Sequence, residues 1–593
     1  MAFAMVTEAV QQSPTIDEPV YVGSAVVYEQ QHGLRYNPEH PPLGKLAMAV
    51  GLGFEHAVLD PSFNQNQTLL GRRLLYESGN NPYRLMLAAR IPMIVLTLLF
   101  GLVVFGFARD LAGPWAGLMA LVLYAFDPDV LAHGSLATLD VPAAGLLLTT
   151  FWMLWRARSR PGLYLPLAGI ALGAALATRA SALPMVPLVL ALSLPAVRRR
   201  WWVRVLAAVG VGAIAVAVVW AVYLAVDPSL RWVTPAGVTN PGGLRGLAVD
   251  LLPFPQPYRD GVLIQFQFES SSFNGFLLGH AYHGRLWYYL PVALLIKTPL
   301  GLLALWAAGA VTMLVRRSLR VAALYTLLPS LVLFLVAMTG ARDFGTRYVI
   351  FMPMFMTVAA TTVLTVRRRA VVGPTGSVVA VPASESTSGA DAGAGSSSGA
   401  GAGAGSGTGW GRPAVDHLDG AGDERHEVGD DSDHASVEKA GAARSAVEGR
   451  SPRVRKMVLL PTLALVLFVA VSSARVFPYF LPYSNEAFGG PAKTHLNLHD
   501  ANVDWGQDLA RLATRLKDRY PGQPVWLVYK GSGVPEYYGI RGRDPLTASN
   551  DEVHGLLVVS DSRVALATGQ LKVLIDSSTP IDEVGYSITI YRR

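Results

Sequence analysis

The sequence contains no cysteine, which excludes disulfide bonds, thiolate metal sites and a cysteine nucleophile. Charged residues are also scarce: Asp, Glu, Lys and Arg make up 15% of the 593 residues, against about 25% in soluble globular proteins. Hydrophobic residues reach 51% and gather in long runs. This composition excludes an ordinary soluble enzyme, a disordered protein and a nucleic-acid-binding module. It indicates a protein whose partner is the lipid bilayer.

The apolar runs predict an α-helical polytopic membrane protein. Crossing a hydrocarbon core about 30 Å thick takes about 20 mostly apolar residues, and a helix satisfies its own backbone hydrogen bonds in lipid. About ten runs qualify, near residues 89–108, 114–128, 139–155, 162–178, 180–196, 203–226, 286–314, 321–339, 347–366 and 457–474. Residues 89–371 therefore form the predicted membrane core, and 453–474 contain the last span.

The arginines predict the orientation of these spans. If the spans alternate, every arginine cluster falls on one side of the membrane, which we assign to the cytoplasm. The clusters contain Arg156, Arg158, Arg160, Arg198, Arg199, Arg200, Arg204, Arg316, Arg317, Arg320, Arg367, Arg368, Arg369, Arg453 and Arg455. The net charge of +7 is then mainly a topology signal. Residues 1–88, 227–285 and 475–593 become extracytoplasmic parts of a multi-pass plasma-membrane protein.

Two polar regions follow the membrane core. Residues 372–452 are rich in Gly, Ala and Ser, which predicts a disordered cytoplasmic linker rather than a phosphate-binding loop. Residues 475–593 predict a small α/β domain. Its expected helix is Leu509–Arg519, and its expected strands are Val525–Tyr529, Leu556–Val559, Val573–Ile575 and Ser587–Tyr591.

Carboxylates at the outer face are candidates for chemistry. Asp17 and Glu18 lie in the first loop, where a solvated acid is the simpler interpretation of Asp17 from its sequence alone. Asp140 lies at the outer end of a predicted span, where a carboxylate is costly and commonly functional. Asp140, two residues before Pro142, also suits a helix N-terminus, and the two roles are compatible.

Basic and polar residues recur on the same face. Prolines hold Glu39 and His40 rigidly before an apolar stretch, 43–59, which contains Lys45 and is predicted to lie in the membrane interface. Lys297 lies inside a predicted span and indicates a phosphate site or an intramembrane salt bridge, for which Asp140 is a candidate partner. The remaining cations are Arg179, in a tight turn between two spans, and Arg347, which precedes Tyr348.

External acids beside cations suit one kind of reaction. A carboxylate base removes the proton of an acceptor hydroxyl, and cations stabilise the charge on a departing lipid phosphate. Nucleotide sugars are absent outside the cell, so a transferase on this face needs a lipid-carried donor and no nucleotide fold.

Several motifs together resemble the dolichyl-phosphate-mannose–protein mannosyltransferases and their bacterial relatives. This group, glycosyltransferase family 39, includes the lipid A aminoarabinose transferases. The motifs are Asp17-Glu18, His40-Pro41-Pro42-Leu43-Gly44-Lys45, Thr138-Leu139-Asp140-Val141-Pro142, Gly284–Pro291 with Lys297-Thr298-Pro299, Gly345-Thr346-Arg347-Tyr348, Asn485–Pro491 and Asp500–Leu509. The resemblance spans nearly the whole chain except the linker.

The resemblance implies a GT-C fold and an inverting transfer from a polyprenyl-phosphate sugar to a protein, lipid or glycan acceptor. It makes Asp17 the base, while Glu18 shapes the site or helps to hold a cation, and Asp140 binds sugar or acceptor. It places Glu39, His40, Lys45, Arg179, Lys297, Arg347 and Tyr348 at the donor phosphate or substrate. Some relatives bind a divalent metal through such an acid and histidine, for which Glu39 and His40 are the candidates here.

The sequence departs from the family pattern in three ways. Residues 1–15 contain no first transmembrane helix, so we expect the natural start to lie upstream or this helix to be missing. Arg179 stands where relatives more often have lysine, which keeps the charge and changes the geometry. The luminal MIR domain of the protein mannosyltransferases is absent.

Two other functions compete with a glycosyltransferase. A transporter or flippase of a lipid-linked precursor is the main alternative. It predicts internal repeats and ionisable groups near the midplane, whereas this sequence shows no repeat and its charges gather at one face. A non-catalytic scaffold leaves Lys297 and Asp140 unexplained. In the tail, Trp505 and Asp504 suit carbohydrate binding, but a buried core tryptophan is the simpler interpretation.

Overall fold

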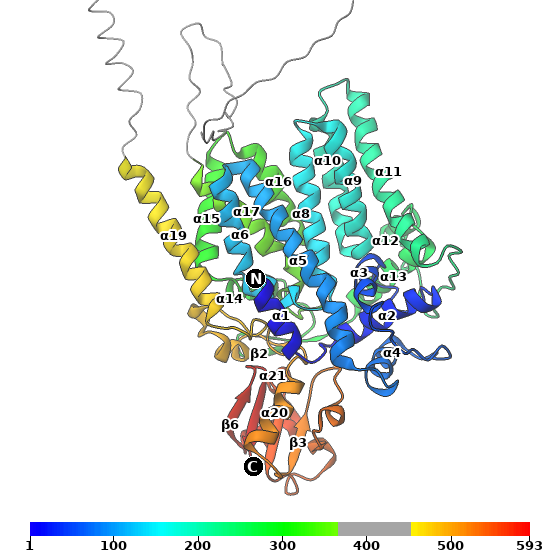
Figure 1. The fold of residues 1–593 in the computed structure, drawn as a ribbon, viewed down its shortest axis with the longest axis vertical. Coiled ribbons are helices and arrows are strands. Elements are labelled where there is room, and N and C mark those ends of the chain that lie inside the picture. Colours follow the sequence, from blue (N-terminus) through cyan, green and yellow to red (C-terminus); the bar gives the residue numbers. More distant parts are fainter. Residues whose placement is uncertain (366–451) are drawn as a thin grey trace, which may run out of the picture. The chain divides into compact units, whose positions relative to one another are not determined.

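The computed structural model describes residues 1–365 and 452–593. The predicted linker, 372–452, lies outside the described residues apart from Pro452. Within the described part, helices form the membrane body and a mixed sheet lies near the C-terminus (Figure 1). Residues 1–365 and 456–593 belong to one compact unit.

Four helices are long and apolar enough to cross a membrane: α5 (Pro82–Ala112), α9 (Pro161–Thr178), α11 (Trp201–Val226) and α16 (Arg320–Ala337). Two bent pairs raise the number to six. They are α6 (Pro114–Ala125) with α7 (Pro128–Gly134), bent by 63°, and α14 (Tyr289–Lys297) with α15 (Leu300–Val315), bent by 115°. The predicted span 286–314 is therefore a bent pair of helices and not one continuous helix, because the chain breaks at Thr298-Pro299, where proline cannot donate a helical hydrogen bond.

The remaining apolar runs form helices that are not among these candidate spans. Residues 139–155 correspond to α8 (Asp140–Ala157), which has charged residues in its first and last turns. Residues 180–196 divide into three short helices, η2 (Ala180–Met185), α10 (Val186–Ser193) and η3 (Leu194–Ala196). The others are η4 (Thr346–Val349), α17 (Phe351–Ala360), η5 (Thr361–Leu364) and α19 (Pro452–Ala474).

Small residues set the spacing between helices of the body. α9 packs between α8 and α11. A Cβ atom added at Gly173 of α9 would lie 2.6 Å from the carbonyl oxygen of Ala215 in α11. One added at Gly169 would lie 2.9 Å from that of Val211. Close backbone contact of this kind is typical of helix pairs in membranes, where packing rather than the hydrophobic effect drives association.

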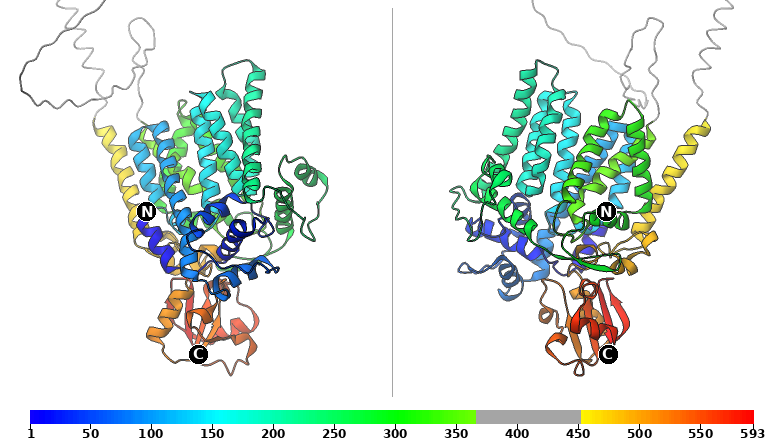
Figure 2. Two further views of the ribbon diagram at one scale, coloured as in Figure 1. Left: turned by 45° about the vertical axis from the view of Figure 1, so that its right-hand side comes forward. Right: turned by 180° about the vertical axis from the view of Figure 1, so that it is seen from behind.

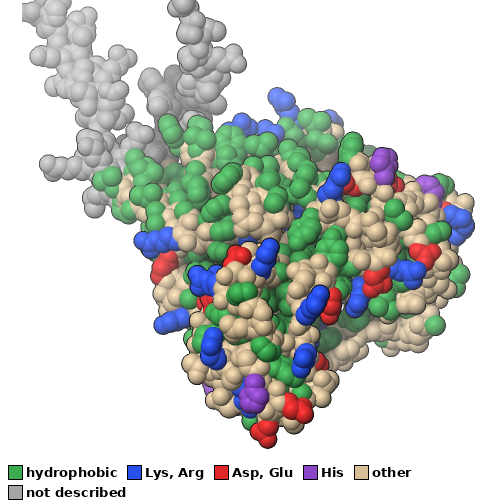
Figure 3. Space-filling model, turned by 60° about the horizontal axis from the view of Figure 1, so that its bottom comes forward, with side chains coloured by type: hydrophobic (Ala, Val, Ile, Leu, Met, Phe, Trp, Pro, Cys, Tyr) green, Lys and Arg blue, Asp and Glu red, His purple; other side chains and the backbone are tan. Residues whose placement is uncertain are grey.

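The surface also distinguishes a membrane body from an aqueous domain. Large hydrophobic side chains such as Trp115, Leu206 and Leu314 are exposed on the helices. Figure 3 shows hydrophobic side chains spread over the helical body and charged side chains of both signs on the sheet domain. The protein is therefore a multi-pass membrane protein.

The loops predicted to face outward contain their own elements. The first includes α1 (Ala2–Gln11), α2 (Glu18–Gln31), α3 (Leu43–Leu52), α4 (Gln67–Arg72) and η1 (Arg73–Glu77). The predicted interfacial stretch 43–59 is helical only over α3, which packs on α2 and α5. Residues 227–285 form α12 (Gly243–Asp250), α13 (Gln256–Ser270) and the hairpin of β1 (Asn274–Leu277) with β2 (His280–His283).

The tail after α19 begins with a connecting segment, residues 475–508. It contains three short helices, η6 (Glu486–Phe488), η7 (Pro491–Leu496) and η8 (Asp500–Asn502). The sheet domain follows (Figure 2). Its elements are α20 (Leu509–Arg519), β3 (Val525–Val528), η9 (Pro535–Tyr538), β4 (Gly542–Arg543), η10 (Pro545–Thr547), β5 (Leu556–Ser560), α21 (Asp561–Ala565), α22 (Gly569–Asp576), β6 (Thr579–Val584) and β7 (Ile588–Arg592).

The five strands lie in the order β4-β3-β5-β7-β6. β3 runs parallel to β4 and β5, whereas β7 runs antiparallel to β5 and β6. The helix Leu509–Arg519 is confirmed, and three predicted strands correspond to β3, β5 and β7. The strand predicted at Val573–Ile575 is wrong: these residues lie in α22, where Leu571 and Leu574, three residues apart, are buried.

Candidate active site

The carboxylate of Asp17 forms an ion pair with the guanidinium of Arg347. The distance from Asp17 Oδ2 to Arg347 Nη1 is 2.5 Å. Asp17 directly precedes α2, and Arg347 lies in η4 after the turn at Gly345. The Arg347 side chain is 9% exposed and that of Asp17 is 29% exposed. The pair is therefore partly buried, with the carboxylate as its more accessible member.

Cations surround His40, beside this pair. The ring of His40 lies edge-on to Tyr21 of α2, with 5.8 Å between ring centroids. Burial lowers the pKa of His40 well below its usual value, and the charges of Arg179, Lys45, Arg342 and Arg347 lower it further. The imidazole is neutral at cellular pH, in a positive field that suits an anion better than a metal ion.

Arg342 was not among the residues selected from the sequence. Its guanidinium donates to Gln265 Oε1 and Glu269 Oε1 of α13, at 2.7 and 3.0 Å, and lies 6.0 Å from the ring centroid of Tyr348. The Nε groups of Arg342 and Arg347 are buried and have no hydrogen-bond partner among the described residues. The only signal for Arg342 in the sequence is its position five residues before Arg347.

Asp140 is the first residue of α8 and forms an ion pair with Arg179, which follows α9. Asp140 is 3% exposed. The charge of Arg179 acts on His40, as do the charges of Lys45, Arg342 and Arg347. These four cations around His40 are the charge cluster of the site. Asp140 is thus the partner of Arg179 and not of Lys297.

Glu18 lies behind the Asp17 pair and is completely buried. Arg90 of α5 donates to its two carboxylate oxygens at 2.7 and 2.6 Å. The backbone N–H groups of Thr15 and Ala137 donate to the same carboxylate at 2.8 and 2.7 Å. Burial alone would raise the pKa of Glu18, but Arg90 and these donors outweigh burial and lower it. Glu18 is placed to fix the backbone next to Asp17 rather than to meet a substrate.

Lys45 and Glu39 stabilise the turn that carries His40. Lys45 Nζ donates to the carbonyl oxygens of Asn37 and His40, each at 2.8 Å, and the residue is fully buried. Glu39 Oε1 accepts from the side-chain amides of Asn37 and Gln67, each at 2.8 Å. Because both side chains already bond to groups of the protein, they serve to hold the turn. The turn then places His40 at the charge cluster.

Lys297 lies at the end of α14 and is completely buried. Its Nζ donates to the carbonyl oxygens of Leu481 and Asn502, at 2.5 and 3.2 Å, and lies 3.2 Å from Asp129 Oδ1. The structure therefore gives the intramembrane lysine a salt bridge with Asp129 and two bonds to the connecting segment. It does not bring Lys297 to the Asp17–Arg347 pair.

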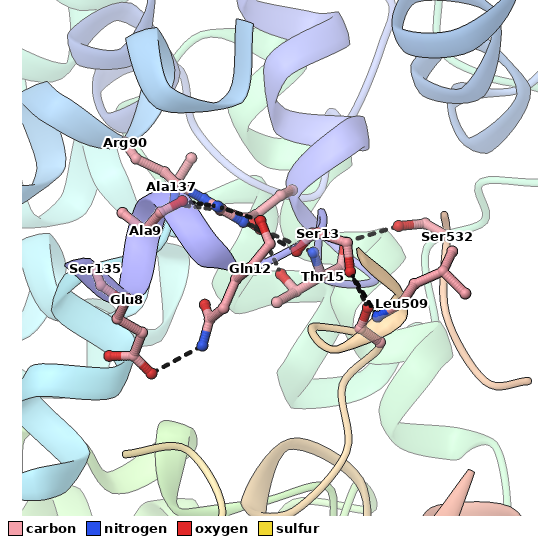
Figure 4. A network of polar contacts seen from close by, with 12 residues as sticks. Glu8, Ala9, Gln12, Ser13, Thr15, Arg90, Ser135, Ala137, Leu509 and Ser532 are labelled. Carbon is pink, nitrogen blue, oxygen red and sulfur yellow. Dashed lines mark hydrogen bonds and ion pairs between the residues drawn. The ribbon is translucent and has the colours of Figure 1, made fainter. Parts of the chain in front are cut away.

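The tail holds the segment that leads into Asp17 (Figure 4). Ser13 N donates to Gln507 O and Ile16 N to Trp505 O, each at 3.0 Å. The Ser13 hydroxyl donates to Gly506 O and accepts from Leu509 N, both at 3.0 Å, as Figure 4 shows in part. Residues 13–16 are thus fixed by the tail on one side and by Arg90 on the other.

The prediction that Trp505 is a buried core residue is confirmed, because Trp505 is 1% exposed. Its core, however, is formed with α1, α5 and α7 rather than with the sheet: the partners include Met5, Ile94 and Leu131. The guanidinium carbon of Arg347 lies 4.4 Å from its ring centroid. An indole in this position stabilises the cation by a cation–π interaction.

Part of the chain is similar to a known protein family. Residues 84–224 match the family model described as dolichyl-phosphate-mannose-protein mannosyltransferase. No curated protein matches the chain significantly. The similar solved structures include two of ArnT from Cupriavidus metallidurans. The apo form has 12% identity and a TM-score of 0.44, covering 99% of this chain and 95% of that one.

The second structure is ArnT bound to undecaprenyl phosphate, with 13% identity and a TM-score of 0.44, covering 99% of this chain and 96% of that one. At this degree of similarity nothing about the ligands of the present chain follows from either structure. The family match includes one of the resembling motifs, Thr138-Leu139-Asp140-Val141-Pro142, and agrees with the resemblance over residues 84–224. Residues 84–224 of this membrane protein are thus similar to the dolichyl-phosphate-mannose-protein mannosyltransferases.

Proposed function

We propose that this protein is a glycosyltransferase that moves a sugar from a polyprenyl-phosphate donor to an acceptor hydroxyl on the extracytoplasmic face, with inversion at the anomeric carbon. The observation that carries the proposal is the Asp17–Arg347 ion pair, 2.5 Å long and partly buried, beside Arg179, Arg342 and His40. A carboxylate next to a cluster of cations supplies the two functions that such a transfer needs.

In the proposed step, the acceptor oxygen attacks the anomeric carbon from the face opposite the phosphate. Asp17 takes the proton of the acceptor hydroxyl as the new carbon–oxygen bond forms. The bond between the anomeric carbon and the phosphate oxygen breaks, and its electron pair leaves with the lipid phosphate. One displacement inverts the anomeric configuration, so no covalent sugar–enzyme intermediate forms.

The arginines are the proposed ligands of the donor phosphate. The Nε groups of Arg342 and Arg347, which have no partner in the part of the chain that the structure describes, are donors that a phosphate oxygen satisfies. Charge-assisted bonds to phosphate are stronger than neutral ones. When the phosphate binds, it competes with Asp17 for the Arg347 guanidinium. The ion pair then weakens, and the Asp17 carboxylate becomes free to accept a proton. The hydroxyl of Tyr348, 3.3 Å from Arg347 Nη2, helps to set the orientation of that guanidinium.

Asp140 and Glu18 have positioning roles in this proposal. Asp140 holds Arg179 at the charge cluster and offers its carboxylate edge to sugar or acceptor hydroxyls. Glu18 holds the chain before Asp17 through Arg90, Thr15 and Ala137. Because Lys45 and Lys297 are saturated by carbonyl oxygens, we assign the donor phosphate to the arginines and give both lysines structural roles.

The proposed fold is of the GT-C type, with about ten membrane segments when the shorter apolar helices are counted. Its orientation follows from the arginine clusters. Arg158, Arg198 and Arg199 line one groove between α9 and α11, and Arg316 donates to Thr365. Cytoplasmic placement of these residues leaves the Asp17 pair and the sheet domain outside.

A transfer assay tests the proposal. Purified protein in detergent receives a short-chain polyprenyl-phosphate hexose and a hydroxyl-bearing acceptor, and both released polyprenyl phosphate and glycosylated acceptor are measured. Asp17→Asn should abolish both products, while Glu29→Gln, an exposed change on the same helix, should retain them. Donor translocation in vesicles without any transfer by the wild-type protein would instead support the transporter.

A further inference from the structure

Three side chains with metal-binding atoms converge in the tail, away from the residues of the candidate active site. His495 lies in η7 of the connecting segment, Asp561 begins α21 directly after β5, and Glu583 lies on β6. One nitrogen or oxygen atom from each lies within 4.8 Å of the other two. Among the described residues, this is the one group of at least three His, Asp or Glu side chains with such geometry.

The same three side chains contain buried polar atoms that lack partners. Asp561 Oδ2, Glu583 Oε1 and His495 Nδ1 have no hydrogen-bond partner within the described ranges. Asp561 is 1% exposed, so its free oxygen is also shielded from solvent. Leaving a buried polar atom unsatisfied costs about 1–3 kcal/mol. Unpartnered buried atoms on three side chains whose ligand atoms converge indicate a ligand-binding site.

The second oxygen of Asp561 is held in place. Thr589 of β7 donates its hydroxyl to Asp561 Oδ1 at 2.6 Å, and the backbone N–H of Asp561 donates to Ser587 O at 2.8 Å. Outer hydrogen bonds of this kind orient the carboxylates that ligate metals. Oδ2 is the Asp561 oxygen that has no partner within the described ranges.

The charges of the group favour a divalent cation. Asp561 and Glu583 each offer a carboxylate and His495 offers a ring nitrogen, with one ligand atom of each within 4.8 Å of the other two. A divalent ion balances two carboxylates and removes their mutual repulsion.

We propose that His495, Asp561 and Glu583 bind one divalent transition-metal ion, zinc by preference. Calcium and magnesium prefer oxygen ligands, whereas an imidazole with two carboxylates suits zinc. Ligand atoms of a tetrahedral zinc site are about 3.3 Å apart, so the side chains close by roughly 1 Å on binding. His495 and Glu583 are half-buried, which leaves a path for the ion.

The ion would join the connecting segment to the sheet. His495 belongs to the segment that also contacts α14, where the Asn485 side chain donates to Leu295 O and Thr298 O at 2.6 and 2.9 Å. Asp561 and Glu583 belong to the sheet domain. The metal therefore has a structural role: it fixes the sheet to the segment that continues to Trp505.

The test uses the full-length protein in detergent, stripped with a chelator and returned to buffer with or without Zn²⁺. Bound zinc is measured by mass spectrometry after desalting, and stability by thermal unfolding. The wild type should retain about one zinc ion more than His495→Gln or Glu583→Gln. The matched controls His554→Gln and Glu536→Gln, which change exposed side chains, should retain as much zinc as the wild type.

Thermal unfolding gives a second comparison, in which the expected order of the wild type and Glu583→Gln differs without and with Zn²⁺. Without metal, Glu583→Gln should unfold at the same or a higher temperature than the wild type, because carboxylate repulsion is lost. With Zn²⁺ the order should reverse. Equal zinc content in the wild type and both site variants, or an unchanged order, would overturn the proposal. An equal stabilisation by Ca²⁺ would overturn the assignment to zinc.

Discussion

The guanidinium of Arg347 lies between the carboxylate of Asp17 and the indole of Trp505. The Arg347 carbon Cζ is 4.4 Å from the ring centroid, and the backbone carbonyl of Trp505 accepts from Ile16, the residue before Asp17. One tail residue thus contacts both sides of the ion pair. The tail is therefore part of the scaffold of the candidate site.

Replacing Trp505 should affect donor use more than stability alone explains. Trp505→Phe keeps an aromatic face but weakens the cation–π contact, which contributes about 0.5–2 kcal/mol. We expect KM for the polyprenyl-phosphate donor to rise several-fold, measured by transfer kinetics at saturating acceptor. Trp526→Phe, in the core of the sheet domain, is the control: it should lower stability and leave donor KM unchanged. Equal kinetics in both variants would show that Trp505 is only a core residue.

Arg347→Lys tests whether geometry or charge matters at the proposed phosphate site. Lysine keeps the charge and loses the planar fork and the Nε–H group. We expect kcat/KM to fall at least about tenfold, which corresponds to about 1.4 kcal/mol of transition-state stabilisation. Arg342→Lys should give a smaller loss, because Arg342 does not pair with Asp17. Arg541→Lys, at an exposed position, is the control, and full activity of Arg347→Lys would remove Arg347 from the site.

The buried Glu18–Arg90 pair should be a determinant of stability. Glu18→Gln leaves the Arg90 charge buried without its counter-ion, and breaking such a pair typically costs about 3–5 kcal/mol. Thermal unfolding in detergent should show a large loss for Glu18→Gln and for Arg90→Met. The double variant should lose less than the sum of the two single variants, since no unpaired charge remains. Strict additivity would argue against a coupled pair.

Glu8 predicts a dependence of stability on pH. Burial in α1 raises its pKa to about 8, from 4.5 in the unfolded chain. Between these values the folded protein keeps a proton that the unfolded chain has lost, so stability falls as the pH rises from about 4.5 to 8. Glu8→Gln removes this effect, on the order of a few kcal/mol at about 1.4 kcal/mol per pKa unit. Unfolding temperatures of wild type and variant should diverge toward pH 8, and parallel curves would contradict the assignment.

The sequence predicted the separate parts of the site better than their contacts. Asp17 and Arg347 each belong to a motif, yet no periodicity indicates that residues 330 positions apart form an ion pair. Lys297 was notable because it lies in an apolar run. Its partners, Asp129 and two carbonyl oxygens of the connecting segment, depend on the break after α14, which the apolar run conceals.

The secondary structure of the sheet domain could also be predicted only in part. β6 carries Pro580, Asp582 and Glu583 at the edge of the sheet, so it lacks the alternation that marks a half-buried strand. Val573 and Ile575 have high β-propensity but lie in α22, because tertiary packing of Leu571 and Leu574 decides the structure there. Arg342 could not be distinguished from other loop arginines, because its role depends on α13 and Tyr348.

The most direct test of the central claim is the rate of sugar transfer by Asp17→Asn in protein that retains wild-type unfolding temperature. The substitution preserves size and removes the base, so transfer should fall about 10²–10⁴-fold while donor binding persists. Glu29→Gln should transfer sugar at the wild-type rate. Undiminished transfer by Asp17→Asn would contradict the assignment of Asp17 as the base, on which the proposed site depends.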